Sequence, residues 1–137
     1  MRRLIRSKLL VIGLAASFWS CNNSIPTIPT NPADKTETFT GTLTPNGAQT
    51  FTFIAVLAGN VTATLTAVSP DVTTQIGLSL GTWNGSSCQE IITKVDAVQG
   101  NSVIGTAKAS SNLCVRVYDA GAKLTAPESF TVRVQHP

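Results

Sequence analysis

The sequence predicts an all-β sandwich, and three observations support this prediction. Polar and apolar residues alternate with a period of two over most of the chain after residue 36. Turn residues interrupt this alternation at roughly the 8–12-residue interval expected of a sandwich or barrel. Charged residues make up only 12% of the chain, about half of the usual share, and threonine takes their place, as is common on β-rich surfaces.

About eight strands are expected from this alternation. The clearest covers residues 61–67, where four apolar side chains alternate with three threonines and therefore face one side of a sheet. The least clear covers residues 91–98, because both of its faces mix charged and apolar groups. The predicted strands are residues 38–43, 50–56, 61–67, 76–80, 91–98, 103–107, 113–119 and 130–135.

Two such sheets, packed about 10 Å apart, would share one hydrophobic core. A domain of about 100 residues buries enough surface to fold alone. The side chains expected in the core are Phe39, Phe51, Phe53, Leu65, Leu78, Val115, Val117, Phe130, Val132 and Val134.

The first twenty residues have the pattern of a secretory signal. Four basic residues lie within residues 1–8, and an apolar run follows over residues 9–19. A membrane-spanning helix needs about 20 apolar residues, so the shorter run indicates an export signal rather than a permanent anchor. We therefore expect residues 1–20 to direct the chain out of the cytoplasm.

Cys21 follows this signal directly. The run Phe18-Trp19-Ser20-Cys21 resembles a bacterial lipoprotein signal, in which a small residue precedes the cysteine that becomes lipidated. The resemblance implies a lipid anchor on Cys21, in the outer or the cytoplasmic membrane. The alternative is ordinary cleavage near Ala15-Ala16, which would leave Cys21 as a spare thiol. The lack of a clean A-x-A site favours lipidation.

The charge of the exported part argues against nucleic-acid binding. The chain has 10 basic and 7 acidic residues, and four of the basic ones lie in the signal, so 10 − 4 = 6 basic residues remain against 7 acidic ones. A net charge near −1 leaves no basic face to neutralise phosphates.

The three cysteines predict one disulfide. Cys88 and Cys114 lie within the β domain and can pair, which leaves Cys21 for the lipid. A zinc site is a poor alternative, because no histidines stand at ligand spacing. On the strand 113–119, Cys114 shares a face with Arg116 and Tyr118 and opposes the core valines. We therefore expect the bridge on the outer side, where it ties down a neighbouring loop.

Residues 21–36 form a Pro/Thr-rich tether between the signal and the domain. Its prolines, Pro26, Pro29 and Pro32, recur every third residue, which favours an extended, polyproline-II-like conformation with little packing. The predicted organisation is therefore a signal peptide at 1–20, a disordered tether at 21–36 and a β-sandwich domain at 37–137.

The stretch from Phe39 to Val134 resembles the bacterial pre-peptidase C-terminal domain. The matching segments are FTGTL at 39–43, FTF at 51–53, AGNVTATL at 58–65, LCVRVYD at 113–119 and SFTVRV at 129–134. The resemblance implies a jelly-roll-like antiparallel sandwich that acts as a non-catalytic module of secreted proteins. Some members bind calcium through several acidic residues of a middle strand. The corresponding residues 71–78 hold only Asp71, so we expect no metal ligand and no cofactor.

No catalytic group is expected. The single histidine, His136, lies one residue from the C-terminus, where we expect a solvated tail that cannot fix a catalytic imidazole. The seven carboxylates are scattered along the chain. We expect Glu90, Lys94 and Asp96 to form a solvated strand face with weak ion pairs.

Two aromatic residues are candidate ligand contacts. Trp83 follows a predicted strand and precedes Asn84-Gly85, so its ring could stack on a sugar. The alternative is that Trp83 caps the open end of the core. Tyr118, on the outer face of its strand, is the second candidate. The sequence therefore predicts a non-enzymatic, envelope-anchored interaction or accessory module for a polysaccharide or protein, with a carbohydrate-binding module as the alternative.

Overall fold

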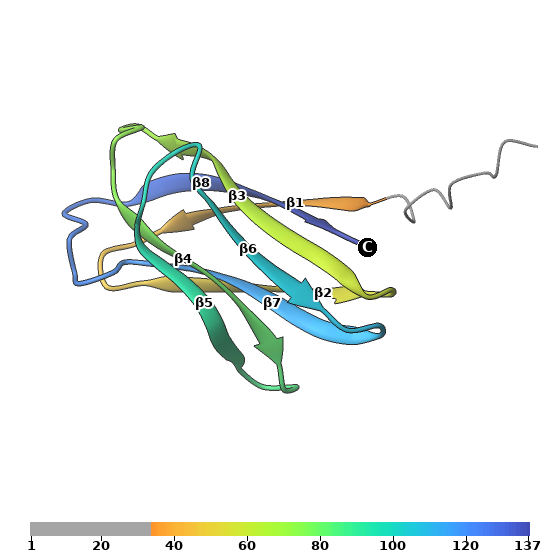
Figure 1. Cartoon of the computed structure of the whole chain (residues 1–137). Coiled ribbons are helices and arrows are strands. Elements are labelled where there is room, and N and C mark those ends of the chain that lie inside the picture. The colour runs from red at the N-terminus through yellow and green to blue at the C-terminus, as the bar shows by residue number, and fades with distance from the viewer. Residues whose placement is uncertain (1–33) are drawn as a thin grey trace, which may run out of the picture.

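The computed structural model describes residues 34–137, and these residues form eight β-strands in two four-stranded sheets (Figure 1). The strands are β1 (Lys35–Leu43), β2 (Ala48–Ala55), β3 (Gly59–Ser69), β4 (Ile76–Trp83), β5 (Cys88–Ala97), β6 (Ser102–Ala107), β7 (Ser111–Tyr118) and β8 (Glu128–His136). The predicted signal segment, Cys21 and the tether up to residue 33 lie outside the described residues. Residues 34–137 contain no helix long and apolar enough to cross a membrane.

The strand order is that of a jelly roll, which confirms the predicted fold class. One sheet has the order β1-β8-β3-β6 and the other the order β2-β7-β4-β5. The strands pair from the outside of the chain inward, β1 with β8, β2 with β7, β3 with β6 and β4 with β5, all antiparallel. The chain is thus one long hairpin rolled into two packed sheets.

All eight predicted strands are present, and the structure explains the ambiguity of the fifth. β5 is the edge strand of its sheet, and its pairing with β4 shifts register twice, between Ile76 and Leu78 and between Leu80 and Gly81. Each shift breaks the strict alternation of faces. Charged and apolar residues therefore mix on both faces of this strand.

The core lies between the sheets and matches the expectation for eight of the ten predicted side chains. These eight are buried, whereas Phe39 and Phe51 are half-buried and pack against the core. Both of these rings lie near the open side formed by the edge strands β1 and β2. They stack on each other with centroids 4.9 Å apart, so they close that side as a pair.

The sandwich has two ends, which differ in what they carry. The entry end holds the start of β1 and the end of β8, where Lys35 pairs with His136 (Figure 1). The C-terminus is held there, because the Val56 N–H donates to the Pro137 carbonyl at 3.1 Å. The far end holds the β1–β2 turn, the β3–β4 loop and the β7–β8 loop.

Asp119 fastens two of these far-end connections together. Its Oδ2 accepts the Asn46 N–H at 2.9 Å, and its Oδ1 accepts the N–H groups of Lys123 at 2.8 Å and Leu124 at 3.2 Å. Burial alone would raise the pKa of this carboxyl, but the three backbone donors together outweigh it and lower the pKa. Asp119 therefore joins the β1–β2 turn to the β7–β8 loop. The sequence alone showed it only as one of several scattered acids.

We expect Asp119→Asn to lower the free energy of unfolding at pH 7 by about 2 kcal/mol. The substitution puts an NH₂ group in the place of one carboxylate oxygen, and this group cannot accept a hydrogen bond from a backbone N–H. The lowered pKa means that Asp119 stabilises the fold above the unfolded-state value of about 4 and ceases to do so as the pH falls below it. Urea denaturation of both proteins between pH 7 and pH 3 would check this. A gap between the two proteins that does not narrow in acid would contradict it.

Candidate binding groove beside Trp83

The outer face of the β2-β7-β4-β5 sheet carries both aromatic residues proposed as ligand contacts. Leu78 and Leu80 of β4 face the core, so the alternate positions Gly77, Ser79, Gly81 and Trp83 face outward. Tyr118 of β7 pairs with Gly77 at the far end of β4, whereas Trp83 ends this strand. Six residues of strand separate the two positions by about 20 Å, so the structure does not bring the two rings together.

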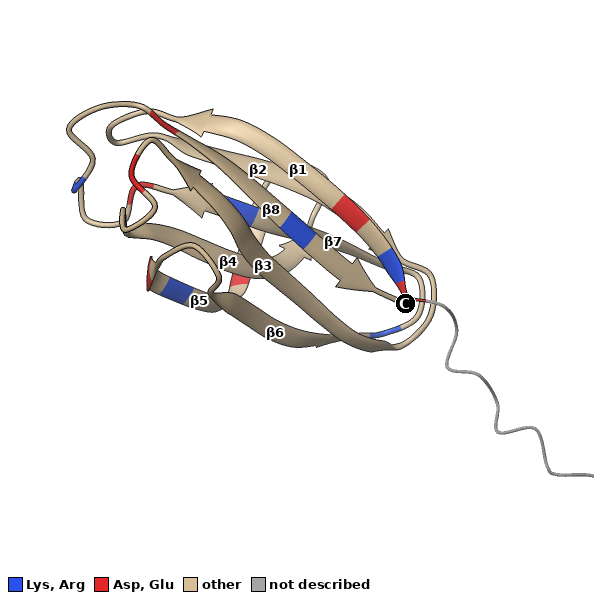
Figure 2. Ribbon diagram, turned by 90° about the horizontal axis from the view of Figure 1, so that it is seen from above, with Lys and Arg blue, Asp and Glu red and all other residues tan. Residues whose placement is uncertain are grey.

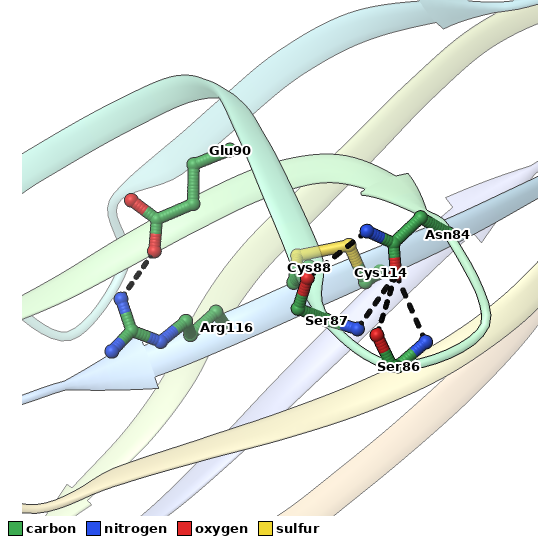
Figure 3. The surroundings of a disulfide bond; sticks show 7 residues. All are labelled: Asn84, Ser86, Ser87, Cys88, Glu90, Cys114 and Arg116. Carbon is green, nitrogen blue, oxygen red and sulfur yellow. Dashed lines mark hydrogen bonds and ion pairs between the residues drawn. A yellow bond between two sulfur atoms is a disulfide. The ribbon is translucent and has the colours of Figure 1, made fainter.

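Tyr118 is a packing residue on this face. A Cβ atom on Gly77 would lie 2.4 Å from the Tyr118 ring, so the ring lies against the bare backbone of β4. The Arg116 guanidinium lies 4.8 Å from the ring centroid, and it also pairs with Glu90 across β4 (Figure 3). Burial raises the pKa of Tyr118. The contacts of the Tyr118 ring are thus made within the domain, with Gly77 and Arg116.

Glu90 lies on an exposed strand face, as expected. It bonds to Arg116 of β7 rather than to a neighbour on its own strand. Lys94 and Asp96 do form the expected ion pair on β5, with Nζ and Oδ1 2.9 Å apart. Among residues 34–137 no group of three or more histidines, cysteines or acids could hold a metal ion.

The predicted disulfide between Cys88 and Cys114 is confirmed (Figure 3). It joins the start of β5 to β7 and passes over β4, where Gly81 pairs with both Cys114 and Glu90. A Cβ on Gly81 would lie only 2.1 Å from the Gln89 carbonyl oxygen, so this position requires glycine. The bridge lies on the outer side of the sheet, as expected, and fixes the β4–β5 connection.

The turn after Trp83 is also fixed by hydrogen bonds. The Asn84 side-chain oxygen accepts the N–H groups of Ser86 at 2.9 Å and Ser87 at 2.8 Å (Figure 3). Gly85 occupies the left-handed region with a φ of 100°, which glycine adopts at little cost. Since Cys88 pairs with Trp83, the backbone of Trp83 lies between a turn closed by hydrogen bonds and the disulfide.

Trp83 lines a groove of about 340 Å³ at the entry end. Trp83 is half-buried and is neither among the buried core residues nor among the partly buried side chains packed against them. The other lining residues come from β1, β2 and β7 and are Lys35, Glu37, Thr52, Phe53, Ile54 and Asn112. The groove thus combines an indole and an aliphatic side chain with a hydroxyl, an amide and two charged groups.

Glu37 links this groove to His136, and here a sequence interpretation is wrong. The predicted solvated tail is in fact the last pair of the β1–β8 ladder, and the His136 side chain is 1% exposed. Its Nε2 lies 3.2 Å from Glu37 Oε1, and its ring packs 5.0 Å from that of Phe53. The alternation on β8 continues to the end of the strand, so position 136 faces the core.

The charge on Glu37 is favoured by its neighbours. Lys35 Nζ lies 2.7 Å from Glu37 Oε1. This hydrogen bond lowers the pKa of Glu37, burial opposes it, and His136 lowers the pKa further. The groove therefore presents a fixed carboxylate beside an exposed ammonium group.

Sequence reasoning found Trp83 but missed its groove partners. Thr52, Ile54 and Asn112 stand next to core residues on their strands, so alternation places them outward. Only the order β2-β7-β4 brings them beside Trp83. Glu37 lies on β1 of the other sheet, and nothing in the sequence pattern indicates that it lies near Trp83.

Comparison with known proteins does not assign this chain to a family. No protein-family model matches the chain, and no match was found among curated proteins. Among solved structures, a similar one is that of Aeromonas hydrophila PliG, a periplasmic lysozyme inhibitor of g-type lysozyme. It is 16% identical, with a TM-score of 0.49 over 75% of this chain and 89% of that chain.

We expect loss of the disulfide to destabilise the domain strongly. Cys88 and Cys114 are separated by 26 residues, and the chain-entropy model gives about 3.5 kcal/mol for closing such a loop. The double variant Cys88→Ala/Cys114→Ala should unfold at correspondingly lower urea concentration. Trp83, the single tryptophan after residue 19, provides the fluorescence signal.

The wild-type protein in reducing agent is the control for that experiment. It should move toward the double variant, while the variant itself should not respond to the reductant. A double variant as stable as the oxidised wild type would show that the bridge does not stabilise the fold.

Proposed function

We propose that this chain is a non-catalytic binding module of the bacterial cell envelope, and that it binds a saccharide in the Trp83 groove. The observation that carries the proposal is the position of the Trp83 indole in an open groove, outside the core and beside hydrogen-bonding side chains. An aromatic ring with a few placed polar groups is the usual composition of a small-ligand site.

The groove's chemistry supports a saccharide as the ligand. The apolar face of a sugar ring packs on an indole, while its hydroxyls need donors and acceptors at the side. Asn112, Thr52 and Glu37 supply these groups. The fixed turn at Asn84 and the bridge at Cys88 hold the backbone on either side of Trp83 in place before the ligand arrives, which reduces the entropic cost of binding.

The anchor and the family remain part of the same proposal. The pattern of residues 1–21 supports export and lipidation of Cys21. The strand segments similar to pre-peptidase C-terminal domains support an accessory role for the domain. The groove lies at the entry end, where Lys35 begins β1, so its ligand would be a polymer close to the anchoring membrane.

We expect Trp83→Ala to weaken saccharide binding at least tenfold, because removal of a central aromatic contact typically costs 1–2 kcal/mol or more. An array of bacterial envelope oligosaccharides, probed with the protein purified after export, would identify the ligand. Titration followed by Trp83 fluorescence would then give the wild-type affinity, and calorimetry would compare the variants.

Tyr118→Phe is the matched control for this test. It alters the other outward aromatic residue but keeps its packing on Gly77, so binding should not change. If wild-type protein retains no oligosaccharide, the saccharide is the wrong ligand class, and a protein partner would be sought instead.

We expect Cys21→Ser to abolish membrane attachment. Cells fed labelled palmitate should label the wild-type chain and not the variant, because the thiol of Cys21 is the proposed attachment point. The variant should appear in the soluble envelope fraction with its domain folded. Palmitate labelling that survives the substitution would rule out Cys21 as the lipid site.

A further inference from the structure

A second recess lies at the far end of the sandwich, away from the Trp83 groove. It has a volume of about 340 Å³ and lies between the β3–β4 loop and the β7–β8 loop. Its polar lining includes Asp71 and Gln75 from the first loop, Lys123 and Thr125 from the second, and Glu128 at the start of β8.

Glu128 is the unusual member of this lining. It occupies an inward-facing position of β8 and is only 9% exposed. Its Oε2 atom is buried and has no hydrogen-bond partner in the part of the chain that the structure describes. In the described residues, only one other buried side-chain atom, Ser79 Oγ, shares this state. An unpaired buried carboxylate oxygen is costly, so a donor that reached it from the recess would be bound favourably.

The protein's own groups do not supply this donor. Lys123 directs its ammonium group to Gln75 Oε1, at 3.4 Å. Asp71, on the rim, is itself an acid, and its Oδ1 accepts the N–H and the hydroxyl of Thr73. The two carboxylates of the recess therefore have no cationic partner within hydrogen-bonding distance in the described part of the chain.

The charge around the recess favours a cationic ligand. Figure 2 shows that acids gather at the end of the sandwich opposite the C-terminus. Four acids, Asp71, Asp96, Asp119 and Glu128, stand there against two bases, Lys94 and Lys123, so the local balance is 2 − 4 = −2. Such a surface attracts positively charged partners and orients their approach.

We propose that this recess binds the guanidinium group of an arginine from a protein partner. A guanidinium offers five N–H donors in a fixed plane, and Glu128, Asp71 and Gln75 offer carboxylate and amide oxygens to receive them. A calcium ion would need six to eight oxygen ligands, and the recess contains two carboxylates next to an ammonium group. The far end points away from the start of β1 (Figure 1), so a macromolecule can reach it while the chain is tethered.

The test uses a blocked Ala-Ala-Arg-Ala-Ala peptide as the probe, with ¹⁵N-labelled protein purified after export. Titration should shift amide resonances of residues 71–75 and 123–128 and leave those around Trp83 in place. The same peptide with citrulline, a neutral isostere of arginine, should shift them at least tenfold less. Glu128→Gln should weaken the arginine peptide about tenfold, because it removes a charged acceptor, and Asp71→Asn should weaken it about threefold.

Asp34→Asn is the charge-matched control, because it removes one negative charge at the entry end and should leave the peptide affinity unchanged. Three results would overturn the proposal: equal shifts by the citrulline peptide, full affinity in a folded Glu128→Gln variant, or calcium chloride displacing the peptide at submillimolar concentration. The last result would identify a metal site instead. Because the recess and the groove lie at opposite ends, failure here leaves the saccharide proposal intact.

Discussion

The pairing of β8 with both β1 and β3 is the constraint on which the rest of the structure depends. It places an inward row of Glu128, Phe130, Val132, Val134 and His136 along the whole length of the core. The three apolar members pack between the sheets, while the two ionisable ones stand at the ends. His136 is paired with Glu37, but Glu128 Oε2 has no hydrogen-bond partner among residues 34–137. The two ends of one strand therefore have different polar environments.

The outer face of β4 explains why Trp83, at the end of β4, and Tyr118, at the end of the neighbouring β7, have different surroundings. Gly77, Ser79 and Gly81 carry no large side chain on this face of the strand. Tyr118, the Arg116–Glu90 pair and the disulfide lie over β4 in turn. Beyond the bridge, nothing in the described residues covers Trp83 in the same way. The covered part of the face is structural, and the uncovered part is the groove proposed to bind a saccharide.

The sequence predicted local features well and contacts between distant residues poorly. All eight strands, most of the core and the Cys88–Cys114 bridge followed from alternation, turn residues and cysteine parity. The role of Asp119 could not be predicted, because its partner Asn46 is 73 residues away. The approach of Glu37 to His136 depends on pairing the first strand with the last. Proximity to a terminus was a misleading guide for His136, since the final strand remains paired to its end.

The pairing of Lys35 with His136 in the β1–β8 ladder also determines whether the order of the strands along the chain can be changed. Partners in an antiparallel ladder have Cα atoms about 5 Å apart, so the first and last strands almost form a continuous loop of chain. Domains whose ends meet in this way commonly tolerate circular permutation. A short linker from residue 137 to residue 35, with new ends opened at Gly100, would preserve every strand pair. With the proposed anchor segment fused to its new first residue, such a permutant would present the Trp83 groove away from the point of attachment.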